Sequence, residues 1–363
     1  MMFSLRRMVW LVVLVGALVA CGGAGDGTPA GETGGDGPAA TAVAETDLAV
    51  LNLPPLSAVS LDGRKLQVVA TTSIIGDVVR QVGGETIDLT VLMGAGQDPH
   101  SYQPAAGDLT RVATADVVFV NGWDLEESLV DDLRNVAEGV SLVPVSAGIV
   151  PLALGEGAEH DEAEHDEAEH DEAEHDEAEH EHGGADPHTW MDPGNVQLWA
   201  MNVATALSAL DPANAAVYQA NAAAYQAQLA DLQDEMAKQL AAIPPAGRVL
   251  VTNHDALGYL AQRYDLQVLG TVLPAASTLA EPSASELANL VAAMQEAGVC
   301  TIFAETTVND TLAQAVAREL AGCDQVQVLT LYTGAIGPAG SGADSYLGMM
   351  RANLAALVAG LQG

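Results

Sequence analysis

The sequence of 363 residues contains few basic side chains. Lys and Arg number 12 against 49 Asp and Glu, which gives a formal net charge of -37. Proteins that bind nucleic acid neutralise phosphates with Lys and Arg, so this balance argues against nucleic acid as a partner. A strongly acidic chain suits a protein that collects cations, although an acidic surface also keeps proteins soluble.

Long hydrophobic runs are also missing, except for one at the N-terminus. The run Met8–Ala20 follows two arginines and is shorter than the roughly 20 apolar residues that a bilayer-spanning helix needs. The pattern predicts a secretory signal over residues 1–21. It ends in Leu18–Cys21, which is similar to the lipobox of bacterial lipoproteins, so Cys21 is expected to be lipidated. A short membrane anchor with an incidental cysteine is the alternative.

Residues 22–61 and the remainder of the chain differ in pattern. The first stretch is rich in Gly, Ala, Thr and Pro without apolar periodicity, which predicts a flexible tether. Beyond it, short apolar segments alternate twice with helical patterns, which predicts two α/β lobes, each a mainly parallel sheet with covering helices, over residues 62–210 and 244–363. Between them, residues 211–243 predict one rigid connecting helix of roughly 45 Å, with a long helix packed on a single domain as the alternative. The strands are expected at residues 66–70, 87–92, 116–120, 142–145, 248–252, 266–272, 301–303 and 326–331.

A tandem repeat lies inside the first lobe. From Ala158 the unit Ala-Glu-His-Asp-Glu occurs four times, and the stretch 156–184 is expected to be a disordered loop. Histidines five apart do not share a helix face, so the tract is not expected to form a rigid helical metal site. Imidazoles and carboxylates at this density predict weak contacts with borderline metals, and a solvated spacer is the alternative. The tract histidines are His160, His165, His170, His175, His180 and His182.

Only three histidines lie outside the tract, and each falls in a loop next to a predicted strand or helix. They are His100, His188 and His254. Ligands of parallel α/β sheets collect at the carboxyl ends of strands, so these imidazoles are expected to meet in the cleft between the lobes. A closed metal site needs a fourth ligand. Asp344, before the final helix, and Glu305, after a strand, are the competing carboxylates.

Five motifs then show a family resemblance. The stretches DPHSYQP, DPHTWMDP, TNHDALGY, IFAETTVN and ADSYLGMMRANL resemble, in this order, the substrate-binding lipoproteins of zinc and manganese ABC importers. The resemblance covers Leu66 to Gly363. It implies two pseudo-symmetric lobes joined by one helix, and metal ligands at His100, His188, His254 and Asp344. Glu305 is then expected to have a structural role or to support a ligand.

The resemblance also implies partners, location and cargo. The expected partners are an ABC permease with its ATPase, and the expected location is the outer face of the cytoplasmic membrane, with a monomer tethered there through its lipid. Relatives with a carboxylate at the position of His254 look like manganese binders, so three imidazoles favour Zn²⁺, with Mn²⁺ as the alternative.

Two further readings stay open at this point. A surface metal buffer or adhesin would use the repeat tract as its active part. A zinc hydrolase would need an open coordination position beside a general base, and no HExxH pattern occurs in the sequence, so no enzyme is expected.

The two cysteines that follow Cys21 belong to the second lobe. Cys300 and Cys323 each precede a predicted strand, and the expected compartment is oxidising. A disulfide between them is therefore predicted, with two buried free thiols as the alternative.

Overall fold

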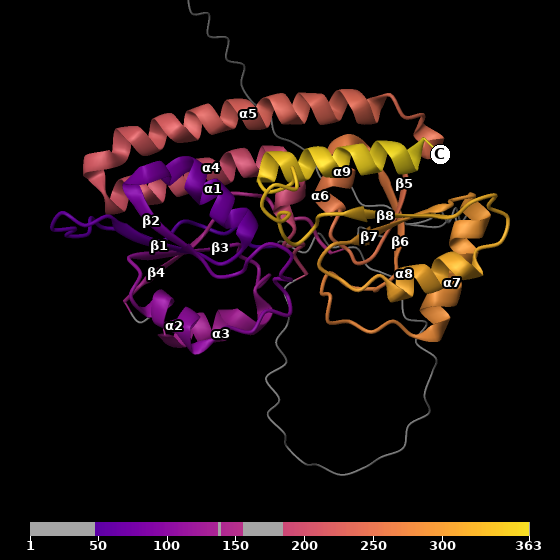
Figure 1. The fold of residues 1–363 in the computed structure, drawn as a ribbon, viewed down its shortest axis with the longest axis horizontal. Helices are drawn as coiled ribbons and strands as arrows, with labels where there is room; N and C mark the ends of the chain where they lie inside the picture. The colour runs from indigo at the N-terminus through magenta and orange to yellow at the C-terminus, as the bar shows by residue number, and fades with distance from the viewer. Residues whose placement is uncertain (1–47, 137–138, 155–183, 363) are drawn as a thin grey trace, which may run out of the picture. The chain divides into compact units, whose positions relative to one another are not determined.

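The structure is a computed structural model that describes residues 48–136, 139–154 and 184–362. Two four-stranded parallel sheets organise this part of the chain (Figure 1). The first has the order β2-β1-β3-β4 and the second β6-β5-β7-β8, so the second repeats the first with every strand number raised by four. The predicted pair of similar α/β lobes is confirmed.

The N-terminal lobe is built around the first sheet. Its strands are β1 Leu66–Ala70, β2 Ile87–Val91, β3 Val117–Val120 and β4 Ser141–Pro144. Its helices are α1 Ser73–Gly83, α2 Ala106–Ala113, α3 Glu127–Val136 and α4 Pro193–Leu210. Alternate residues of β1 enter two different apolar clusters, one with α1 and α4 and one with α2 and α3. Both faces of the sheet are therefore covered, as a parallel sheet requires.

The C-terminal lobe follows the same plan. Its strands are β5 Val249–Thr252, β6 Gln267–Thr271, β7 Thr301–Glu305 and β8 Gln327–Leu331. Its helices are α6 Gly258–Tyr264, α7 Ala284–Ala297, α8 Thr311–Glu319 and α9 Tyr346–Leu361. Cys300 and Cys323 form the predicted disulfide in this lobe.

The helix α5, Ala215–Ala241, connects the lobes. Its 27 residues correspond to about 40 Å. It packs against α1 and α4 of the first lobe and against α6 and α9 of the second, and Figure 1 shows it running along both. Its buried residues, among them Tyr218, Tyr225 and Leu232, join the apolar cluster that extends through both lobes. The predicted long connecting helix is thus present.

Residues 48–61 correct one prediction. They belong to the expected tether, yet they lie against the N-terminal lobe. Backbone hydrogen bonds link Val59 N to Leu210 O and Gly148 N to Leu51 O, both at 2.9 Å. Leu53 and Leu56 also pack against the core. Isolated leucines spaced among prolines gave no strand or helix period, which is why the sequence pattern missed this packing.

No helix among the described residues is long and apolar enough to cross a bilayer. The predicted signal, Cys21 and the repeat tract lie outside the described residues.

Candidate metal centre

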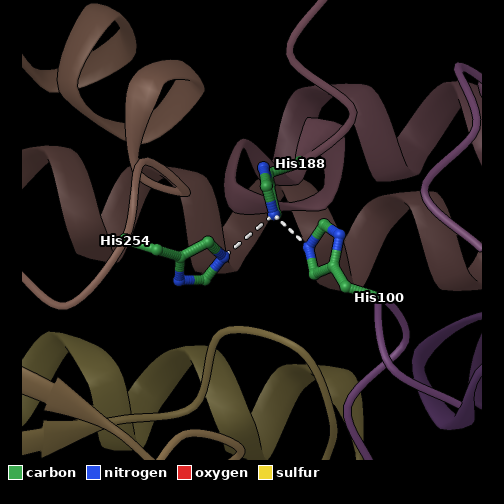
Figure 2. Close-up of side chains that lie close together, drawn as sticks. All are labelled: His100, His188 and His254. Carbon is green, nitrogen blue, oxygen red and sulfur yellow. Dashed lines mark hydrogen bonds between the residues drawn. The ribbon is translucent and has the colours of Figure 1, made fainter. Parts of the chain in front are cut away.

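The three histidines outside the repeat tract meet between the lobes (Figure 2). His100 lies in the connection from β2 to α2, His254 follows β5, and His188 lies just before α4. All three are buried, with 3% or less of each residue exposed. The connections from β2 and β5 leave the carboxyl ends of parallel strands, where ligand sites are expected in such sheets.

The imidazoles present the same ring nitrogen to a common point. His188 Nε2 lies 3.2 Å from His100 Nε2 and 3.2 Å from His254 Nε2. Figure 2 shows His188 between the other two, with its Nε2 directed toward both. Four ligands at 2.0–2.1 Å around a tetrahedral ion lie about 3.3–3.4 Å from one another, so this spacing fits a transition-metal ion.

A separate carboxylate contacts the opposite nitrogen of each ring. His100 Nδ1 lies 3.0 Å from Glu127 Oε1, and His188 Nδ1 lies 2.9 Å from Asp186 Oδ1. His254 Nδ1 lies 2.7 Å from Glu305 Oε1. A carboxylate at Nδ1 keeps the proton there, which fixes the tautomer and leaves the Nε2 lone pair for a metal.

The surroundings shift the pKa values of two of these imidazoles in opposite directions. Burial, together with the neighbouring histidines, places the pKa of His188 well below its ordinary value. Burial also acts to lower the pKa of His254, but the Glu305 carboxylate outweighs it, and the net pKa is raised. His188 is therefore neutral and ready to bind a metal, whereas a proton competes for His254.

The turn after β3 brings Glu127 to His100. Gly122, Trp123 and Asp124 have φ values of 101°, 49° and 52°, all in the left-handed region. This sharp turn allows α3 to begin at Glu127, with its side chain on His100. Glycine removes the steric cost at the first of these positions only, so the neighbouring packing must stabilise the other two.

The structure does not bring the fourth predicted ligand to this centre. Asp344 is exposed, and its Oδ2 accepts a hydrogen bond from Gly340 N at 2.7 Å in the loop before α9. Among the described residues, the group able to hold a metal contains the three histidines and not Asp344. The sequence shows that Asp344 precedes a helix. It does not show that the loop before this helix directs the carboxylate toward the backbone of the same loop. Glu305 Oε1 instead lies against His254 Nδ1.

Two supporting residues were missed by sequence reasoning. Asp186 had a signal, since Asp-Pro-His occurs at residues 98–100 and again at 186–188. Glu127 had none, because it lies 27 residues from His100 and comes close only through the turn after β3.

A cavity of about 530 Å³ opens beside His100. Leu51 and Trp123 of the N-terminal lobe line it, as do Ala276 and Ser277 of the other lobe. The group of three histidines therefore borders a cavity between the lobes on its His100 side.

Comparison with known proteins gives the family. Residues 68–360 match the family described as ZnuA, the periplasmic component A of a zinc-uptake complex. The chain is 31% identical over 302 residues to the manganese-binding lipoprotein MntA of Halalkalibacterium halodurans, covering 83% of this chain and 90% of that one. It is 30% identical over 306 residues to the manganese ABC transporter substrate-binding lipoprotein PsaA of Streptococcus mitis, covering 82% and 90%.

Solved structures agree. The periplasmic zinc binding protein TroA from Treponema pallidum matches with a TM-score of 0.71 and 28% identity, over 82% of this chain and 99% of that one. A mutant, manganese-bound form of the periplasmic metal binding protein of Candidatus Liberibacter asiaticus matches with a TM-score of 0.69 and 28% identity, over 82% and 100%. The chain belongs to the ZnuA family, whose members are extracytoplasmic metal-binding receptors of ABC transporters and not enzymes.

Proposed function

We propose that this protein captures Zn²⁺ between its lobes and delivers it to the permease and ATPase of an ABC importer. The observation that carries the proposal is the convergence of three Nε2 atoms, each on a ring whose Nδ1 is held by a carboxylate. Three imidazoles form a ligand set that suits zinc, whereas manganese favours carboxylate and water oxygens.

Manganese is the alternative, because several of the relatives are named for that metal. Metal affinity order also favours Zn²⁺ over Mn²⁺ at any site of nitrogen ligands. His254 contributes a nitrogen to the group. The choice of zinc depends on this nitrogen, because a carboxylate oxygen at the same position would favour manganese.

Three imidazoles leave one position of a four-coordinate ion for a ligand from outside the group. Catalytic zinc sites share this ligand count, but they place a general base beside the open position. Here Glu127, Asp186 and Glu305 each hold an imidazole. Capture and release without covalent chemistry is therefore the function that the geometry favours.

The lipid anchor and the repeat tract are further parts of the proposed function. Cys21 would carry the lipid anchor, and a monomer would work at the outer face of the cytoplasmic membrane. The tract histidines of residues 156–184 would add weak metal contacts and are not required for the centre. The surface-buffer alternative instead places binding on that tract.

Metal analysis of the purified chain tests the proposal. We expect one tightly bound Zn²⁺ per chain in competition with Mn²⁺, with and without residues 156–184. His100→Ala, His188→Ala and His254→Ala should each weaken zinc binding by at least about 100-fold, because each removes one of three protein ligands. Wild-type affinity in all three variants, or binding that disappears with the tract, would refute the proposed site.

A further inference from the structure

Two copies of the same tripeptide use their aspartates differently. In Asp98-Pro99-His100 and in Asp186-Pro187-His188, the aspartate Oδ1 accepts a hydrogen bond from the histidine backbone N, at 3.1 and 2.9 Å respectively. Asp186 Oδ1 also holds the ring of its own histidine. Asp98 does not hold the His100 ring, which Glu127 contacts instead.

The second oxygen of Asp98 reaches across the cleft. Asp98 Oδ2 accepts hydrogen bonds from Ser101 Oγ at 2.8 Å and from Thr278 Oγ1 at 2.6 Å. Ser101 belongs to the same loop as His100. Thr278 belongs to the C-terminal lobe, in the connection from β6 to α7, 180 residues away in sequence.

The Thr278 connection lies beside the approach to the metal centre. Its residues Ala275, Ala276, Ser277 and Ala280 line the same cavity as His100. The bond between Asp98 and Thr278 therefore links two segments whose neighbouring residues line this cavity, next to His100.

His100 is held differently from the other two histidines. One nearly buried carboxylate holds both the backbone N and the ring of His254, and another does the same for His188; the Glu305 and Asp186 side chains are 0% and 4% exposed. His100 is instead held by two carboxylates, with Asp98 at its backbone N and Glu127 at its ring. The Glu127 side chain is 23% exposed. The carboxylate on the His100 ring is thus more exposed than the carboxylates on the other two rings.

We propose that the hydrogen bond between Asp98 and Thr278 is an interlobe latch that positions His100 and sets the rate at which the metal leaves. While the lobes are together, Thr278 fixes the carboxylate that in turn fixes the His100 backbone. When the lobes separate, this bond breaks and His100 is the ligand freed first. The proposal rests on the proposed metal capture, and both Asp98 and Thr278 act as positioning residues.

Three variants test the latch against its local surroundings. Thr278→Val removes the hydroxyl and keeps the shape, Thr278→Ser keeps the hydroxyl, and Ser101→Ala removes the other hydroxyl on the same oxygen within one lobe. Zinc release from the full chain into excess chelator is followed by stopped flow. We expect zinc release to be about 10-fold faster in Thr278→Val, because this variant loses a hydrogen bond to a charged group. Thr278→Ser and Ser101→Ala should release within about 3-fold of wild type.

Two results would overturn the proposal. One is a wild-type release rate in Thr278→Val, and the other is equal acceleration in Ser101→Ala, which would make the effect local to the loop. Thermal unfolding of each variant shows whether the fold is kept, and rescue by Thr278→Ser separates loss of the hydroxyl from loss of packing.

A measurement without metal tests the interlobe hydrogen bond independently of the proposed zinc binding. Amide hydrogen exchange of residues 275–280 should be faster in Thr278→Val and unchanged in Ser101→Ala. If the wild-type protein failed to bind Zn²⁺, the proposed function would be wrong. The exchange comparison would still show whether Thr278 holds the two lobes together.

Discussion

Glu305 holds His254 with a single oxygen: Oε1 accepts from the His254 backbone N at 3.0 Å and lies 2.7 Å from Nδ1. The carboxylate ends β7, and the histidine follows the neighbouring strand β5. Strand pairing therefore sets the place of this imidazole. The other oxygen accepts a hydrogen bond from Thr333 Oγ1, which fixes the orientation of the carboxylate.

Replacement of this carboxylate should weaken metal binding without removing a ligand. We expect Glu305→Gln to lower zinc affinity about 10- to 100-fold, because the ring loses its charged partner and part of its basicity. Chelator competition measures the change. Glu281→Gln, at an exposed position, is the matched control and should bind as wild type does. Equal affinities for Glu305→Gln and the control would contradict the support role of Glu305.

Zinc affinity should fall as the pH decreases. Burial opposes a charge on His254, yet Glu305 raises its pKa above the ordinary 6.5. Above that raised pKa the ring is neutral and binds metal fully, and below it a proton must first leave, so affinity declines by about 10-fold per pH unit. In Glu305→Gln the pKa of His254 should decrease, so the decline should begin at a lower pH. Affinities measured at about pH 5 to 8 check both curves, and identical curves would exclude this coupling.

An oxygen ligand in place of one nitrogen should shift metal preference. We expect His254→Glu to raise the ratio of manganese to zinc affinity by about 10-fold or more, because carboxylate oxygen suits Mn²⁺ better than imidazole does. Parallel titrations with the two ions give the ratio. A His254→Gln variant offers an uncharged oxygen and should shift the ratio less. An unchanged ratio in both variants would show that the third ligand does not set preference.

The disulfide should stabilise the C-terminal lobe. It joins Cys300 to Cys323 across a separation of 23 residues, and a loop of this size predicts about 3 kcal/mol. Urea unfolding of Cys300→Ser with Cys323→Ser should show a loss of this order. The reductant dithiothreitol should destabilise the wild type by a similar amount and leave the double variant unaffected. Equal stability of the two proteins would mean that the bond adds nothing in solution.

Residues 48–61 should contribute to stability as well. A chain that begins at residue 62 loses the packing of four partly buried side chains, and we expect a cost of about 3 kcal/mol in the free energy of unfolding. A chain that begins at Thr46 is the control and should match the longer protein. The four side chains are Leu53, Leu56, Val59 and Leu61. Equal midpoints for both shortened chains would contradict the packing.

The lobes were predictable because their strands are short buried runs bounded by polar turns. All eight strands lie where the apolar segments were found, with ends that differ by at most about two residues. The three histidines were predictable for a related reason, since parallel strands bring their carboxyl ends to one edge. The sequence pattern could not place Asp344, because neither its exposure nor its bond to Gly340 follows from its position before a helix.

Long-range contacts explain the remaining gaps. Glu127 reaches His100 through a turn with three left-handed residues. The Asn121-Gly122 pair marks a turn but does not show which distant residue the turn brings close. Thr278 reaches Asp98 from the other lobe. Both contacts depend on how complete elements pack, and no spacing along the chain reports that.

The sequence distances between the three imidazoles have a consequence for the lifetime of the protein. The neighbouring pairs are 88 and 66 residues apart, so an ion held among them would cross-link three distant parts of the chain. Binding to the folded state alone stabilises it by about 4 kcal/mol at a ligand concentration roughly 1,000 times the dissociation constant. Loaded and empty molecules would therefore differ in resistance to proteases, and metal starvation would shorten the life of the idle receptor.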